Sequence, residues 1–181
     1  MDSFYNDVND WLSVGGDLDL ARDVTGKEPS STIADLLAHG VTHVLDLRSE
    51  WSDKDEWASA GMPAGNYAHI PIVDSHRHIP SEDWFSAVET FVENFWLNSV
   101  DGERLYVHCH MGINRAPSAA MLALLTIDPT LSPLDAFLAV RSARPVAGLV
   151  YAEAVGIRHL LNAEEVTAED LTAAGELPAT V

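Results

Sequence analysis

The sequence predicts a single α/β domain in which helices flank a central, mostly parallel β-sheet. Runs rich in β-branched and aromatic residues, typical of strands, alternate with segments that repeat apolar residues at helical spacing. Alternation of this kind builds a sheet with helices on both faces. The chain has 181 residues, 47% of them hydrophobic, so one apolar core can form without a disulfide or metal.

Three strands and five helices are expected. The strands are 41–47, 67–73 and 104–108, and the helices begin near residues 30, 81, 117, 133 and 149. Ser30 or Ser31 can cap the first helix, which ends at His39 before Gly40. The second begins at Pro80 and Ser81 and repeats apolar residues every three or four positions.

The later helices have their own signals. Residues 117–127 are apolar on every side, as in a central helix. Ser132 and Pro133 begin the helix that runs to about residue 143, and the last helix covers 149–161. We therefore expect one domain over residues 1–162, followed by an acidic C-terminal tail or short helix over 163–181.

The charge balance limits the binding partners. Acidic residues number 28 against 10 basic ones, for a formal net charge of -18. This surplus argues against a nucleic-acid groove and against an anionic bilayer. Five arginines against three acids in residues 104–160 instead suggest a small anionic target.

The cysteine content and the lack of a membrane signal predict where in the cell the protein is located. Cys109 is the single cysteine, so no internal disulfide can form and a reducing compartment is favoured. No apolar run approaches membrane-span length, and the N-terminal residues lack signal-peptide features. We expect a cytoplasmic protein.

The segment from His108 to Arg115 carries the strongest chemical signal. The expected strand RLYVH leads into the loop CHMGINR and then into an apolar helix. Helix N-termini offer unpaired N–H groups and partial positive charge, which favour a bound anion and the thiolate form of Cys109. Gly112 lets the backbone approach closely, and Arg115 can hold two phosphate oxygens at once.

Cys109, Gly112 and Arg115, preceded by His108, resemble the Cys-x5-Arg loop of the cysteine-based protein tyrosine phosphatases. The dual-specificity branch, with loops of the type HCxxGxSRSxT, is most similar. The segments VGGDLDLARD, VTHVLDLR, YAHIPIVD and VRSARP also resemble segments of that family, so the likeness covers most of residues 11–161.

The resemblance implies a two-step, cofactor-independent hydrolysis of phosphate monoesters. Cys109 would attack phosphorus to form a cysteinyl phosphate, which water then hydrolyses. Arg115 would bind and stabilise the phosphoryl group, together with the loop residues His110, Met111, Gly112, Ile113 and Asn114. Asp74, in IPIVD, matches the family's general acid and lies 35 residues before Cys109, a few more than is common.

Supporting roles are also expected. His108 would fix the loop through hydrogen bonds, and Arg48 would form a structural ion pair. Arg141 and Arg144 match a pair of arginines in VRSARP-like segments of relatives, of which the second can meet a substrate anion near the pocket mouth. Both are therefore candidate substrate contacts.

The loop departs from the family at three positions. Ala116 stands where the family has a hydroxyl residue that assists release of the cysteine thiolate, so breakdown of the phosphoenzyme is expected to be slow. Asn114 replaces the usual serine, and His110 is a bulky, titratable neighbour of the nucleophile. The sequence assigns no role to these last two substitutions.

Two alternatives remain open at this point. Asp74, His76 and His78, with His108 and His110, form His-x-His pairs that a zinc or iron hydrolase could use, although no metal is expected on the main hypothesis. Ala116 allows a catalytically silent phosphate-binding module. The main hypothesis is a phosphatase for phosphotyrosine in proteins, with phosphoserine and phosphothreonine as further substrates. The loop has no lysine, which makes a lipid substrate less favoured.

Overall fold

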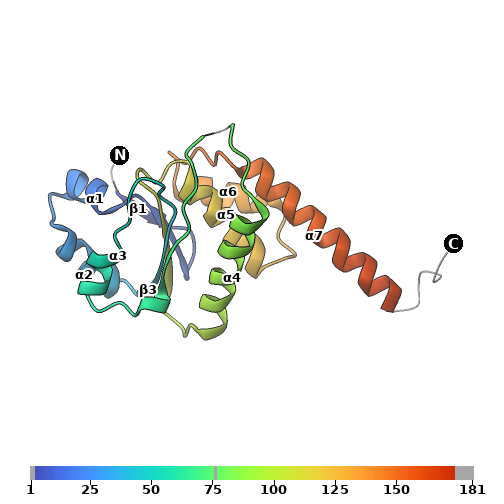
Figure 1. The fold of residues 1–181 in the computed structure, drawn as a ribbon, viewed down its shortest axis with the longest axis horizontal. Coiled ribbons are helices and arrows are strands. Elements are labelled where there is room, and N and C mark those ends of the chain that lie inside the picture. Colours follow the sequence, from blue (N-terminus) through green and yellow to red (C-terminus); the bar gives the residue numbers. More distant parts are fainter. Residues whose placement is uncertain (1–2, 76, 174–181) are drawn as a thin grey trace.

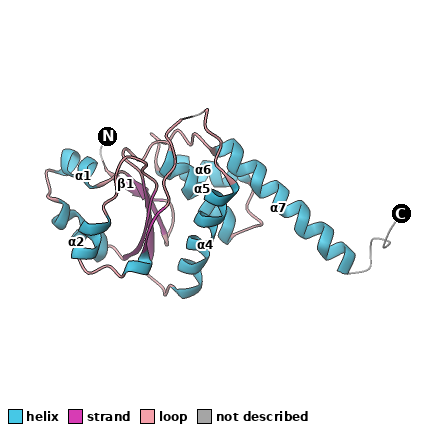
Figure 2. Ribbon diagram, in the orientation of Figure 1, coloured by secondary structure: helices cyan, strands magenta, loops and turns pink. Residues whose placement is uncertain are grey.

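A five-stranded sheet forms the centre of the protein in the computed structural model, which describes residues 3–75 and 77–173 (Figures 1 and 2). The strands are β1 (Tyr5–Asp7), β2 (Leu12–Gly15), β3 (Val41–Asp46), β4 (Tyr67–His69) and β5 (Arg104–His108). Their order in the sheet is β1-β2-β5-β3-β4. Only β1 is antiparallel to its neighbour, so the expected mostly parallel sheet is confirmed.

Helices cover both faces of this sheet. The helices are α1 (Leu18–Thr25), α2 (Pro29–Ala38), α3 (Lys54–Ser59), α4 (Glu82–Asn98), α5 (Arg115–Ile127), α6 (Pro133–Ala143) and α7 (Ala152–Ala173), with a short 3-10 helix at Ala64–Asn66. Helices α1 to α3 lie on one side and α4 to α6 on the other (Figure 1). Each side has its own apolar cluster, and α5 lies at the centre of the larger one, as its uniformly apolar sequence predicts.

Three strands were predicted, and two others were missed. Strand β4 ends at His69, short of the expected residue 73. Strands β1 and β2 lie in a segment where turn residues interrupt short apolar runs. All four residues of β2 are nevertheless buried, because β2 pairs in parallel with β5 on one side and antiparallel with β1 on the other.

Helix boundaries follow local capping where a side chain supplies it. Ser81 and Ser132 cap α4 and α6 by accepting hydrogen bonds from Trp84 N–H and Asp135 N–H, as expected. The expected cap at Ser30 or Ser31 is wrong: α2 already begins at Pro29, whose fixed φ suits the first helical position.

The last helix also differs from its expected bounds. Helix α7 begins at Ala152 and runs to Ala173, so it crosses residue 161, where it was expected to end. It extends away from the rest of the protein (Figure 1). The division into a domain at 1–162 and a tail at 163–181 stays a prediction. Among the described residues, no helix combines the length and apolarity needed to cross a bilayer.

The topology brings three loops together. Strands β2, β3 and β5 are parallel neighbours, so the segments that follow Gly15, Asp46 and His108 leave the sheet at the same edge. This is the edge at which ligands bind in open α/β folds.

Candidate active site

The loop 109–114 connects β5 to the N-terminus of α5, and Gly112 is essential to its shape. Gly112 has φ of 65°, a region that favours glycine. A Cβ atom there would lie 2.3 Å from the carbonyl carbon of Gly15 and 2.4 Å from its oxygen. The loop therefore packs directly on the backbone that follows β2, and the N–H of Cys109 donates to the Gly15 carbonyl (3.4 Å).

Four successive carbonyl groups of the loop point into the protein body. They accept hydrogen bonds as follows: His110 from the N–H of Asp17 (3.0 Å), Met111 and Gly112 from Arg144 Nη2 and Nε (3.0 and 2.6 Å), and Ile113 from the N–H of Gly148 (2.6 Å). In a trans peptide the N–H points opposite to the C=O. The N–H groups of residues 111–114 therefore face away from the body, and within the described residues none has an acceptor. The loop forms an anion-binding concavity beside Cys109.

Arg144 does not lie where a substrate could meet it, whereas Arg141 is exposed and its contact with a substrate stays a prediction. Arg144 is 1% exposed and lies behind the loop, where it also donates to the side chain of Asn6. Arg141 donates to the carbonyl of Ala147. The expectation that Arg144 lies at the pocket mouth is wrong, because its guanidinium is used to orient the loop carbonyls.

Arg115 is 2% exposed, and its guanidinium is held by Glu50. Its Nη1 and Nη2 donate to the two carboxylate oxygens of Glu50 at 2.7 and 3.1 Å. Burial opposes the charge of Arg115, but the hydrogen bond to Glu50 and the nearby Cys109 and Asp74 charges raise its pKa above the ordinary value. The Nε edge of the guanidinium is buried and has no hydrogen-bond acceptor among the described residues.

Asp74 lies beside this edge. Its Oδ2 is 3.6 Å from Arg115 Nε, and its Oδ1 accepts a hydrogen bond from Asn114 Nδ2 at 3.0 Å. The Tyr151 hydroxyl fixes the backbone on both sides of Asp74, because it donates to the carbonyl of Val73 and accepts from the N–H of Ser75. The structure thus brings together Cys109, Arg115 and Asp74, and it gives Asn114 a role that the sequence did not assign.

The two histidines on either side of Cys109 differ in environment. His110 is partly exposed, contacts the ring of Trp51 edge-on and pairs through Nδ1 with Asp17 Oδ2 at 2.8 Å. His108 is 1% exposed and stacks on Tyr106, and neither of its ring nitrogens has a hydrogen-bond partner in the described part of the chain. The expectation that His108 supports the loop through hydrogen bonds is therefore wrong.

The missing hydroxyl after Arg115 is not supplied by the next serine. Ala116 is fully buried. Ser118 Oγ donates to the carbonyl of Asn114 (2.8 Å) and accepts from the N–H of Tyr151 (3.0 Å). Both contacts hold the backbone in place, so the Ser118 hydroxyl does not replace the one that is missing at Ala116.

A buried ionic cluster lies under the site. Arg48 is 0% exposed and pairs with Asp17, Asp46 and Asp53 at 2.8–3.0 Å, which agrees with the expected structural role. Burial opposes its ionisation, but the hydrogen bond and charge of Asp46 raise the pKa of Arg48 above its ordinary value. Because Asp17 also pairs with His110, the cluster connects β3 to the loop 109–114.

The histidines of the metal alternative are not gathered at one point. His110 pairs with Asp17, His108 lies against Tyr106, and His78 packs on Tyr151. His76 lies outside the described residues. Among the residues that the structure describes, no group of three or more His, Cys, Asp or Glu side chains is placed to hold a metal ion.

Comparison with known proteins identifies the family. Residues 25–164 match the model of the dual specificity phosphatase catalytic domain. The chain belongs to the dual-specificity phosphatase family. This membership makes the protein a cysteine-based phosphatase by class. No curated protein sequence matches the chain.

Solved structures of phosphatases share the fold. The structure of PTPMT1 has a TM-score of 0.67 at 19% identity, over 93% of this chain and 99% of that one. PTP-2 phosphatase of Cydia pomonella has a TM-score of 0.67 at 18% identity, over 86% and 89% of the two chains. Human DUSP28 has a TM-score of 0.59 at 20% identity, over 86% and 92%. These likenesses establish the fold.

Sequence reasoning missed Glu50, Trp51 and Asp17. Glu50 and Trp51 follow β3, and Asp17 follows β2. The available signal was topological: strands beside the one that carries Cys109 end at the same edge of the sheet, so polar residues directly after them are candidates.

Proposed function

We propose that this phosphatase hydrolyses phosphate monoesters of proteins, above all phosphotyrosine, through a cysteinyl-phosphate intermediate. The observation that supports this proposal is the loop after Cys109. Four of its N–H groups have no acceptor among the described residues and face away from the body, and Arg115 follows directly after them. A phosphoryl group bound there accepts hydrogen bonds from the amides and from Arg115 Nε. These donors are fixed before the substrate arrives, so they stabilise the transferring group without reorganisation.

The proposed reaction has two steps. The Cys109 thiolate attacks phosphorus, and the bond to the leaving oxygen breaks while Asp74 gives that oxygen a proton. Asp74, now ionised, takes a proton from water as the water attacks phosphorus, which releases inorganic phosphate and restores the thiolate. Its place 3.6 Å from Arg115 Nε supports this role, because it lies beside the edge that the phosphoryl group would occupy.

The surroundings of the site favour a protein substrate over a phosphoinositide. Trp51 and His110 form an aromatic pair. Trp51 follows Glu50, which binds Arg115, and His110 follows Cys109. Glu50 and Asp74 add negative charge there, and the loop has no lysine. A multiply phosphorylated headgroup is usually held by clusters of basic residues. PTPMT1 has been solved in complex with PI(5)P, so this lipid is a necessary comparison in the test.

A second candidate is a phosphate-binding module with little turnover, which Ala116 favours. Without a hydroxyl after Arg115, release of the thiolate from the cysteinyl phosphate lacks one hydrogen-bond donor. Tight binding of a phosphopeptide without release of phosphate would distinguish this module from an enzyme. We also propose a cytoplasmic location, because the lone thiol at Cys109 requires a reducing environment to stay active.

The test compares wild type with Cys109→Ser on para-nitrophenyl phosphate across pH 5 to 8 in excess EDTA. Activity that survives EDTA and is lost with the thiol is the expected result, and activity lost only to EDTA would favour a metal hydrolase. The second arm compares a phosphotyrosine peptide with PI(5)P in vesicles. Higher kcat/KM on the lipid would refute the proposed substrate class.

A further inference from the structure

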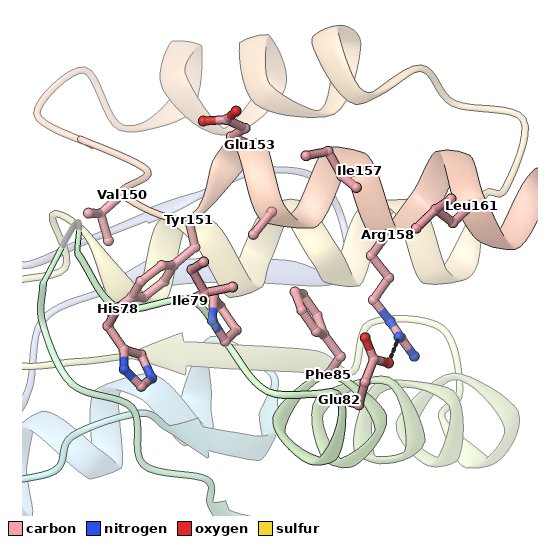
Figure 3. Close-up of a pocket in the computed structure, with 12 residues that line it drawn as sticks. His78, Ile79, Glu82, Phe85, Val150, Tyr151, Glu153, Ile157, Arg158 and Leu161 are labelled. Carbon is pink, nitrogen blue, oxygen red and sulfur yellow. Dashed lines mark hydrogen bonds and ion pairs between the residues drawn. The ribbon is translucent and has the colours of Figure 1, made fainter.

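A groove of about 450 Å³, shown in Figure 3, lies outside the loop that carries Cys109. Its walls are the segment 78–80, the first turn of α4 and one face of α7. No residue of the loop 108–115 lines it. Its volume falls in the range of sites that hold small ligands or a few side chains of a partner.

Apolar side chains dominate the groove and are open to solvent. Ile79, Ile157 and Leu161 are 79%, 53% and 55% exposed. They line the same groove from two segments far apart in sequence, and Phe85 of α4 also lines it (Figure 3). Single exposed apolar residues are common, but several around one groove mark an interaction surface.

The charge of the groove is negative. Glu82 and Glu153 line it, and the side chain of Glu82 is 81% exposed. Arg158 is the one arginine among the lining residues, and its Nε and Nη2 donate to the carboxylate of Glu89 at 2.7 Å while its Nη1 donates to Glu82. The positive charge of Arg158 is therefore already matched by carboxylates. A complementary occupant combines an apolar side chain with a basic one.

This charge argues against occupants from the chain itself. Residues 163–181 contain five acidic residues and no lysine or arginine. A second copy of the chain carries the same net charge of -18, so its approach is opposed by repulsion. A basic segment of a different protein has neither disadvantage.

The groove lies close enough to the active site for one substrate to reach both. His78, on the groove, follows Asp74 by four residues, which span at most about 14 Å. Tyr151 lines the groove, and its hydroxyl bonds the backbone on both sides of Asp74. An extended peptide covers the same distance in about four residues.

We propose that the groove docks a segment of the phosphoprotein substrate in which a leucine or isoleucine is next to an arginine or lysine. This docking proposal rests on the proposed protein phosphatase function and adds a substrate class to it. The docked segment lies about four to eight residues from the phosphorylated residue. The apolar side chain packs on Ile79 and Ile157, and the basic side chain pairs with Glu82 or Glu153.

The test uses phosphotyrosine peptides that are identical around the phosphorylated residue. One set carries Leu-Arg-Leu-Lys six residues before or after it, and the matched set carries Ser-Gln-Ser-Gln there. Each kcat/KM is divided by the value for para-nitrophenyl phosphate in the same protein, which corrects for any change at the active site. We expect wild type to prefer one of the Leu-Arg-Leu-Lys peptides about tenfold, mainly through KM.

Three variants make the comparison specific. The preference should fall to about twofold or less in Ile157→Ser and Glu153→Lys. It should remain in Leu97→Ser, a control that removes a 78% exposed apolar side chain outside the groove. Equal kcat/KM for all peptides in wild type, or a preference that survives both groove variants, would refute docking in this groove.

A binding measurement separates this proposal from the proposed function. Fluorescence anisotropy reports binding of a labelled, unphosphorylated Leu-Arg-Leu-Lys peptide to Cys109→Ser. If the enzyme hydrolyses para-nitrophenyl phosphate but none of the phosphopeptides, the proposal of a protein substrate is refuted. Binding weakened about tenfold by Ile157→Ser would then still support the groove as a site for such segments, and absence of binding would refute it.

Discussion

Replacing Glu50 with glutamine should impair the enzyme by loosening Arg115. The Glu50 carboxylate accepts from both terminal nitrogens of the guanidinium, at 2.7 and 3.1 Å, while Arg115 Nε remains without an acceptor in the described residues. Glu50 therefore holds one edge of the guanidinium and leaves the other for phosphate. Glutamine keeps the shape of the side chain but removes its charge and one of the two acceptors.

The size of the effect follows from the exposure of the two partners. Hydrogen bonds to charged groups contribute about 1.5–3 kcal/mol, and exposed ion pairs contribute about 0–1 kcal/mol. Arg115 is 2% exposed, but the side chain of Glu50 is 41% exposed, so an intermediate value of about 1–2 kcal/mol is reasonable. This corresponds to a loss of about 5- to 30-fold in kcat/KM on para-nitrophenyl phosphate.

The pH dependence gives a second readout of the same pair. The hydrogen bond from Arg115 lowers the pKa of Glu50 below its ordinary value. A depressed acidic pKa contributes stabilisation that is fully present above the ordinary value and is lost as pH falls through the depressed one. The ratio of wild-type to Glu50→Gln activity should therefore be constant from about pH 5 to 7, because Glu50 stays ionised throughout this range.

The opposite outcome would show that Glu50 competes with substrate. In that case Glu50→Gln would lower KM and raise kcat/KM, and orthovanadate would inhibit it more strongly than wild type. Glu93→Gln, at an exposed position on α4, is the matched control and should leave the kinetics unchanged.

Three further variants test the roles of other residues. Asp74→Asn should slow phenyl phosphate hydrolysis about 100-fold or more and para-nitrophenyl phosphate hydrolysis much less. Phenoxide is the poorer leaving group and needs the proton more. Equal losses on both substrates would show that another residue is the acid. Wild type should show a rapid-mixing burst that Ala116→Ser abolishes, and no burst in either protein would contradict a slow second step. Arg144→Ala leaves two loop carbonyls unpaired and should cost about 3 kcal/mol, or roughly 6–12 °C in Tm, by thermal denaturation; an unchanged Tm would show that the loop does not depend on Arg144.

The part of the site that could be predicted is contiguous in sequence. Cys109, Gly112 and Arg115 lie in one loop between a strand and a helix, so spacing and local conformation suffice to place them together. The fold class could be predicted for a similar reason, because the alternation of apolar patterns is local. Glu50 and Asp17 have no local signal, since they reach the site only because β3 and β2 flank β5 in the sheet.

Arg144 shows why a motif does not determine a side chain's role. Its sequence context predicted a substrate contact, but the direction in which the side chain points depends on packing between α6 and the loop. In the structure it faces Met111 and Gly112 from behind. Burial costs an arginine its hydration, and desolvation lowers the pKa of Arg144, so the position is maintained by the carbonyls that it orients.

The contacts behind the loop fix the direction of its N–H groups, so we expect them to matter for the proposed catalysis. Each loop carbonyl that is bonded into the body turns the next N–H away from the body and toward the position that we propose for the phosphate, because the peptide is planar and trans. Asp17 connects this arrangement to Arg48 through a pair that is 0% exposed on both sides, so the loop rests on a buried ion pair. Disturbing that cluster should lower kcat without removing any group that contacts the phosphoryl oxygens, because the amides would lose their common orientation.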